Sequence, residues 1–217
     1  MACFLCRLVC GPRWIAATDR WFGSRWDEPN NEDEIFDRES NQDALRAAYD
    51  LRKTDAAEAF QKFVGFAEHG SVWSMHQVGA SLLYGLGTPI NHSQAESWLR
   101  LAYKSGSAGA MLLLAYAYMR QRRFKEAEAL LSGYEETDYC PALYLLGLIY
   151  LDTARKRQAR FMLEKASALG HRIAKRSLAR SCMSGRFGIR AIPHGFALVE
   201  QVRKDIEKSG GESASVG

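Results

Sequence analysis

A pattern of small and apolar residues that recurs along the chain constrains the fold more than any other feature of this sequence. Gly70, Gly106 and Gly170, with Asp138 at the corresponding point of the remaining unit, mark positions 36, 32 and 32 residues apart. A period in this range is typical of repeat proteins in which each unit is a pair of helices that buries its apolar face against its neighbours. The sequence therefore predicts a stack of helical hairpins.

The residues on either side of each marker describe the two helices of a unit. Before the glycines the spacing is 3, 4 and 4, which puts side chains on one helix face and a left-handed C-cap at the end: Ala59, Lys62, Phe66 and Gly70; Ala95, Trp98, Ala102 and Gly106; Ala159, Met162, Ala166 and Gly170. After each marker a small residue stands between larger ones: Met75, Val78, Gly79 and Leu82; Ala110, Leu114, Ala115 and Tyr118; Ala142, Leu146, Gly147 and Tyr150; Ala174, Leu178, Ala179 and Cys182. The small residue lets the facing helix approach closely.

Local capping signals agree with these boundaries. Asp55 followed by Glu58, and Ser93 followed by Glu96, have the form of a capping box at a helix start. Residues 41–52 add one less regular helix, and the scarcity of Val, Ile and Thr runs argues against a β-sandwich. We predict an all-α fold, a right-handed α-solenoid of antiparallel helix pairs over residues 41–208.

Charge divides the rest of the chain. Residues 1–26 combine four arginines with three tryptophans, residues 27–39 carry seven acidic residues against one arginine, and residues 155–208 carry 14 basic residues against four acidic ones. We expect a Trp/Arg-rich extension over residues 1–26, an acidic linker over 27–40 and a disordered polar tail over 209–217. The basic C-terminal quarter would attract an acidic partner by its long-range field.

The number of cysteines and the hydropathy of the chain indicate where the protein is located in the cell. Five cysteines, an odd number, suit a reducing compartment better than a disulfide framework. No apolar run approaches the roughly 20 residues that span a bilayer. The expected location is cytoplasmic, with peripheral attachment at the inner face of a membrane left open. Cys3, Cys6 and Cys10 lack a fourth metal ligand nearby, and lipidation of these thiols also stays open.

The first full unit resembles a known family. Its residues, in order, are Val78-Gly79, Leu82, Gly85, Gly87, Ala95, Trp98, Ala102 and Gly106. This pattern resembles the Sel-one-like repeat, a close relative of the tetratricopeptide repeat, and the resemblance extends over about residues 56–208. Later units replace the glycine loop by Gln121-Arg122-Arg123 and by residues 152–155, which is closer to the tetratricopeptide form.

The resemblance implies binding of a protein or peptide in the concave groove lined by the leading helix of each pair. Carried over by position, this face consists of Gln77, Ser81, Tyr84, Leu112, Tyr116, Met119, Arg120, Tyr144, Leu148, Leu151, Arg176, Arg180 and Met183. We expect a groove for an apolar or helical segment with an acidic flank, with Tyr116 and Tyr144 as anchors and Arg176 and Arg180 as charge partners. The alternative is that several of these residues pack between helices.

Motifs for chemistry are absent from the sequence. The five histidines are scattered, and Gly85-Leu86-Gly87 is not followed by the Lys-Ser or Lys-Thr of a phosphate loop. We therefore expect a non-enzymatic scaffold or adaptor without cofactor or metal.

Two other functions are weighed against the scaffold. The first is docking of the Trp/Arg-rich N-terminus on an anionic membrane surface. The second, less favoured because aromatic platforms are missing, is nucleic-acid binding by a basic stripe that consists of Arg172, Lys175, Arg176, Arg180, Arg203, Lys204 and Lys208.

Overall fold

The computed structural model describes the backbone of residues 32–212 and the side chains of residues 34–205. Contacts divide the chain into residues 1–30 and residues 31–217, and everything described below belongs to the second unit. No β-strand occurs among residues 32–212, so the predicted all-α fold is confirmed. The Trp/Arg-rich extension and its three cysteines lie outside the described residues.

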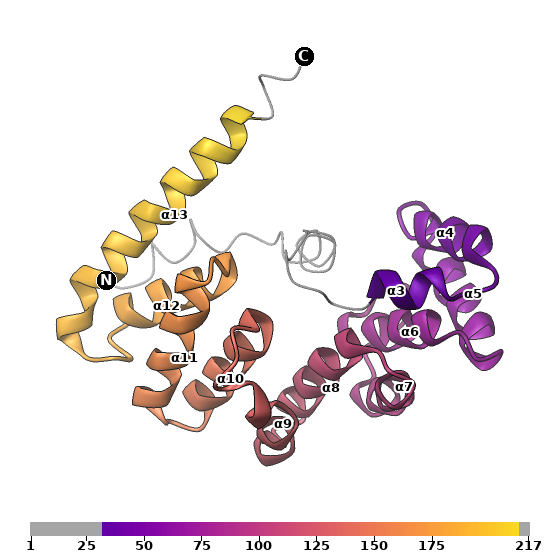
Figure 1. The fold of residues 1–217 in the computed structure, drawn as a ribbon, viewed down its shortest axis with the longest axis horizontal. Coiled ribbons are helices and arrows are strands. Elements are labelled where there is room, and N and C mark those ends of the chain that lie inside the picture. Colours follow the sequence, from indigo (N-terminus) through magenta and orange to yellow (C-terminus); the bar gives the residue numbers. More distant parts are fainter. Residues whose placement is uncertain (1–31, 213–217) are drawn as a thin grey trace. The chain divides into compact units, whose positions relative to one another are not determined.

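Helices follow one another along the chain, and each contacts the next from α4 to α13 (Figure 1). They are α3 (Glu32–Asp37), α4 (Gln42–Leu51), α5 (Ala56–Glu68), α6 (Val72–Tyr84), α7 (His92–Lys104), α8 (Ala108–Arg120), α9 (Phe124–Leu131), α10 (Cys140–Asp152), α11 (Lys156–Ala168), α12 (Arg172–Met183) and α13 (Ile192–Glu212), with 3₁₀ turns η1 (Ser132–Tyr134) and η2 (Ile189–Ala191). The predicted repeat units are therefore α6 with α7, α8 with α9, α10 with α11 and α12 with α13. We call the first helix of each pair leading and the second trailing.

The small residues of the repeat set the distance between paired helices. A Cβ atom at Gly79 of α6 would lie 2.4 Å from Cγ of Leu99 on α7, and one at Gly147 of α10 would lie 2.8 Å from Leu163 on α11. Both leucines are fully buried. The close approach predicted from the sequence is confirmed at these two pairs.

The helix ends follow the predicted glycines, with one correction. Gly70, Gly106 and Gly170, which follow α5, α7 and α11, have φ of +94°, +98° and +90°, the left-handed conformation that ends a helix. Asp55 caps α5 as expected, because its side chain accepts hydrogen bonds from the next amides. The expected cap at Ser93 is wrong: α7 begins earlier, and Asn91 accepts from the amide of Gln94 instead.

Ion pairs join successive repeat units on the trailing side. Arg123 donates to Glu96 at 2.6 Å and lies over the ring of Tyr118 at 4.5 Å from its centroid. One unit further, Arg155 donates twice to Glu128, both at 2.6 Å, and lies over the ring of Tyr150 at 4.2 Å from its centroid. Arg123 and Arg155, each in the loop after a leading helix, thus bind a glutamate of the preceding trailing helix.

Both ends of the predicted solenoid differ from the expectation. Residues 32–37, assigned above to the acidic linker, form α3, whose Ile35 is buried and whose Phe36 packs edge-on against Trp73 of α6 at 5.2 Å between ring centroids. At the other end α13 continues to Glu212, into the segment expected to be a disordered tail. The other domain boundaries remain predictions.

Candidate functional site

One tyrosine from each of the leading helices α6, α8 and α10 contributes to a row of aromatic side chains: Tyr84, Tyr116 and Tyr144. Tyr84 and Tyr116 are stacked, with ring centroids 5.7 Å apart and planes 28° from parallel. Burial raises the pKa of Tyr84 well above its ordinary value, and the nearby Tyr116 and Tyr144 hydroxyls raise it further. The structure thus brings the predicted anchors Tyr116 and Tyr144 together and places Tyr84 beside them.

Tyr144 connects this row to the basic helix α12. Burial raises its pKa, while a hydrogen bond with Ser177 and the charges of Arg180 and Arg176 act in the opposite direction. Arg176 and Arg180 therefore lie close enough to Tyr144 to influence its hydroxyl, and both side chains are exposed. The two predicted charge partners are next to the predicted anchor.

His171 supports Tyr144 from the start of α12. The two rings are stacked with centroids 4.9 Å apart, and Nδ1 of His171 accepts a hydrogen bond of 2.9 Å from the amide of Ala174. Burial lowers the pKa of His171 to about 4, so the imidazole is neutral at physiological pH. Ser71 and Ser107 occupy the same capping position at the starts of α6 and α8.

A groove of about 460 Å³ lies between the C-terminal halves of α8 and α10. We call this space the groove, and its lining residues are Tyr116, Met119, Arg120, Arg122, Phe124, Leu148, Leu151, Asp152 and Arg186. Tyr116, Met119, Arg120, Leu148 and Leu151 belong to the face expected from the sequence. The remaining four are on loops or at helix ends.

The residues that sequence reasoning missed lie where a leading helix meets the loop that follows it. Arg122 and Phe124 flank the start of α9, Asp152 is the last residue of α10, and Arg186 follows α12. The sequence pattern shows Arg122 and Asp152 only as replacements of the glycine loop. Arg122 and Phe124, a basic and an aromatic residue in the shortened loop after α8, are the signal that could have identified part of this set.

The groove arginines differ from the arginines of the trailing side. Within the side chains of residues 34–205, Arg123 and Arg155 form ion pairs with glutamates, whereas Arg120, Arg122 and Arg186 do not take part in any. Arg122 instead lies over the ring of Phe124, 5.9 Å from its centroid. With Asp152 as the single acidic lining residue, the groove carries excess positive charge beside apolar and aromatic side chains.

Other predicted site residues lie outside the groove lining. Gln77 is largely buried and accepts a hydrogen bond from Arg52 at 3.4 Å, which favours packing between α4 and α6. Leu112 is half-buried on α8, on the same face as Tyr116. Whether these residues bind a partner stays a prediction.

The basic stripe is partly neutralised. Lys175 of α12 donates to Asp205 of α13 at 2.9 Å, and Arg203 binds Glu200 at 2.7 Å. Part of the charge proposed for nucleic-acid binding is thus satisfied within the protein, while Arg172 remains exposed.

Comparison with known proteins adds one observation about this fold. No protein-family model matches the chain, and no curated protein matches it. Among solved structures, a Sel1 repeat protein from Oxalobacter formigenes is similar, with a TM-score of 0.51 and 16% sequence identity over 87% of this chain and 81% of that one. The chain has the Sel1-repeat fold. The family resemblance of the sequence and the arrangement of its helix pairs therefore agree.

The described part of the Sel1-repeat fold also bears on membrane insertion and metal binding. None of the helices in the described part of the chain is long and apolar enough to cross a membrane. Among the described residues, no three His, Cys, Asp or Glu side chains are grouped so that they could hold a metal ion.

Proposed function

We propose that this chain is a non-enzymatic protein-interaction scaffold or adaptor that binds an apolar segment with an acidic flank. The observation that carries the proposal is the groove, where Arg120, Arg122 and Arg186 surround apolar side chains without ion-pair partners among the described residues. Guanidinium groups of this kind form short, bidentate hydrogen bonds with carboxylates. A ligand with carboxylates at the edge and an apolar side chain in the centre satisfies both kinds of lining.

The apolar part of the groove supplies the anchor. Tyr116, Leu148 and Leu151 are each half-buried, so they retain surface that a partner can remove from water. Burial of an apolar side chain contributes about 1.5–3 kcal/mol. Aromatic side chains in such central positions commonly dominate the binding energy of an interface. Tyr116 is therefore the first candidate for an energetic hot spot.

The chain itself offers an example of an acidic helix on a leading helix. In α3, Ile35 and Phe36 stand between acidic residues, and Phe36 contacts Trp73 of α6. Trp73 and Tyr84 share one face of α6, because they are 11 residues apart, about three helical turns. This intramolecular packing supports a ligand of the same composition on the neighbouring leading helices α8 and α10.

A peptide selection tests the proposal. The full chain is immobilised and used to select binders from a random peptide library. The selected peptides should combine Leu, Phe or Trp with Asp and Glu, and their affinity is then measured by fluorescence anisotropy. Arg120→Glu with Arg186→Glu should weaken binding at least tenfold.

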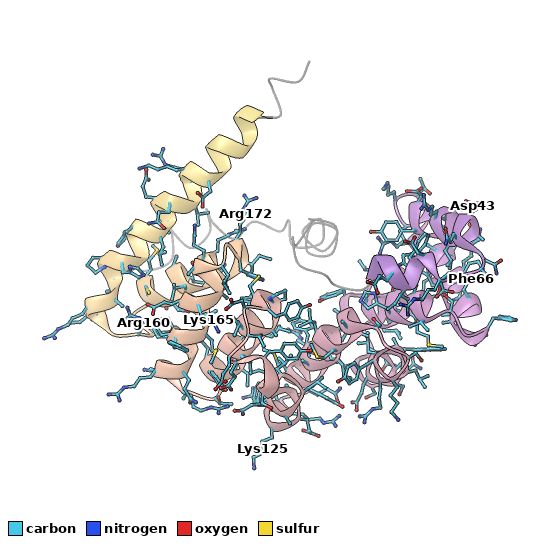
Figure 2. The ribbon with its side chains drawn as sticks, in the orientation of Figure 1. Asp43, Phe66, Lys125, Arg160, Lys165 and Arg172 are labelled. Carbon is cyan, nitrogen blue, oxygen red and sulfur yellow. The ribbon has the colours of Figure 1, made fainter. Side chains whose placement is uncertain are left out.

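A matched control keeps the change in net charge constant. Lys125→Glu with Arg157→Glu alters two exposed positions on the trailing helices, and Figure 2 shows Lys125 pointing outward from α9. These substitutions should leave the affinity unchanged. Equal weakening by both double variants would mean that only the overall charge matters, and the groove would not be the binding site.

A further inference from the structure

The last helix exposes an apolar side chain at a position that is fully buried in the trailing helices α7, α9 and α11. In trailing helices α7, α9 and α11 the residues that correspond to Val199 of α13 are Leu99, Leu131 and Leu163, all with 0% exposure, whereas Val199 is 45% exposed. Gly195 of α13 fixes this alignment, since it packs on the backbone of Ala179 as Ala159 packs on Gly147. The difference arises because each earlier trailing helix also contacts the leading helix of the next unit.

The position after Gly195 carries a different kind of side chain in α13 than in α7 and α9. Where α7 and α9 carry Glu96 and Glu128, whose carboxylates bind the arginine of the next unit, α13 carries Phe196, which is 58% exposed. A terminal unit of a helical-repeat protein ordinarily needs a polar outer face for solubility. Phe196 and Val199 lie on one helix face, three residues apart, so they form an apolar patch rather than a polar cap.

Side chains of both charges lie next to this patch, on its C-terminal side. Glu200 and Arg203 share the face of Phe196 and Val199, form an ion pair of 2.7 Å, and have side chains that are 47% and 63% exposed. A face that carries apolar groups together with both signs of charge is complementary to itself. Self-complementarity is the requirement for a two-fold interface between identical subunits.

The described side chains at the opposite end of the repeat array do not provide a suitable partner. Among the described side chains, those of α3, α4, α5 and α6 include no exposed large apolar residue; the first in the sequence is Ile90. Head-to-tail stacking of copies would therefore set the apolar face of α13 against a polar end. Pairing of α13 with α13 of another copy instead places two apolar faces against each other.

We propose that α13 is a homodimerisation helix that packs against α13 of a second copy of this chain. In an antiparallel arrangement centred between Val199 and Glu200, Phe196 of each copy lies opposite Arg203 of the other, which permits a cation–π contact. The two Val199 side chains meet near the axis, and Glu200 is within reach of Arg203 across the interface. A single helix pair buries little surface, so the dimer is weak and its population depends on concentration.

Sedimentation velocity of the full chain over a concentration series tests this proposal. The parent should shift from monomer to dimer with increasing concentration, and Phe196→Glu with Val199→Glu should abolish the shift. Phe161→Glu, at a position of α11 that is 61% exposed and not on this face, controls for replacing an exposed phenylalanine by glutamate and should leave dimerisation unchanged. Circular dichroism checks that each variant keeps the helical content of the parent.

Two results would overturn the proposal. One is a parent chain that stays monomeric up to several hundred micromolar, which is also the result expected if another part of the chain or a different protein covers α13. The other is a dimer that persists in the Phe196→Glu, Val199→Glu variant. Neither result bears on the peptide groove, because its test uses other residues.

Discussion

Gly87, in the loop after α6, is the position where the close packing of this fold can be tested most directly. Its φ is +71°, and a Cβ atom there would lie 1.9 Å from the carbonyl oxygen of Ala56 and 2.8 Å from the amide nitrogen of Ala57. Both contacts are with backbone at the start of α5, which cannot rotate away as a side chain can. Gly87→Ala therefore combines an unfavourable backbone conformation with a steric overlap.

The magnitude follows from these two contributions. The left-handed conformation costs a residue with a side chain about 1–2 kcal/mol, and forcing an extra carbon into a packed site costs roughly 1–3 kcal/mol. Gly87→Ala should thus lower the free energy of unfolding by about 2–5 kcal/mol. Urea unfolding followed by far-ultraviolet circular dichroism measures this change.

Three other glycines separate the contributions. Gly70 has a φ of +94° and open space around it, so Gly70→Ala carries the conformational cost alone. Gly79 lies inside α6 against Leu99, so Gly79→Ala carries the overlap alone, partly offset by the better helix propensity of alanine. Gly65 is inside α5 with nothing within 4 Å, and Gly65→Ala should stabilise the protein by up to about 1 kcal/mol.

The order of the four variants is the critical result. If Gly87→Ala destabilises the protein no more than Gly70→Ala does, the loop after α6 does not pack against the start of α5, and the reasoning is refuted. A Gly65→Ala variant less stable than the parent would contradict the open space around that position.

Three further predictions concern the loops, the junctions and His171. Ala154→Gly should stabilise the protein by about 1 kcal/mol in urea unfolding, because Ala154 has a φ of +60°. A double-mutant cycle on Glu128 and Arg155 should give a coupling free energy of about 1 kcal/mol, because Arg155 donates two hydrogen bonds to the Glu128 carboxylate. This coupling should fall in high salt, because both side chains are partly exposed to solvent. His171 accepts a proton more readily when unfolded, so stability should be lost as the pH falls from 6.5 toward about 4, by up to about 3 kcal/mol. His171→Ser, which replaces the capping Nδ1 by a hydroxyl oxygen as at Ser71 and Ser107, should flatten this part of the pH profile of unfolding.

The sequence predicts the helix pairs of this fold well because their ends are encoded locally. Gly70, Gly106 and Gly170 have the left-handed φ that the repeat spacing requires, and Gly79 sits where the facing helix is closest. Such positions depend on backbone conformation and on neighbours three or four residues away. The helix start at α7 was misplaced because Asn91 and Ser93 are both good capping residues, and the local pattern does not choose between them.

The site could be predicted only in part because its outer members come from tertiary packing. Tyr116 and Leu148 follow from the helix face, but Arg122, Phe124 and Arg186 reach the groove from loops whose paths the repeat pattern does not specify. The docking of α3 likewise depends on the contact between Phe36 and Trp73, residues 37 positions apart in the sequence. A short acidic segment has no periodic signal that would predict it.

The pairing of charges along the trailing side explains why the last unit differs from the others. Glu96 and Glu128 each bind an arginine of the next unit, so these junctions gain an ion pair as well as apolar contacts. At the third junction the glutamate is replaced by Arg160, which binds Glu164 within its own helix, and Phe187 occupies the position of the loop arginine. At the end of the array Phe196 takes the glutamate position and is exposed. The ion pair that joins one unit to the next is thus absent at the third junction, and an apolar patch takes the place of its glutamate on α13. A helix that ended the array only as a solubilising cap would need a polar residue there, so this substitution favours a second interface at α13, separate from the groove between α8 and α10.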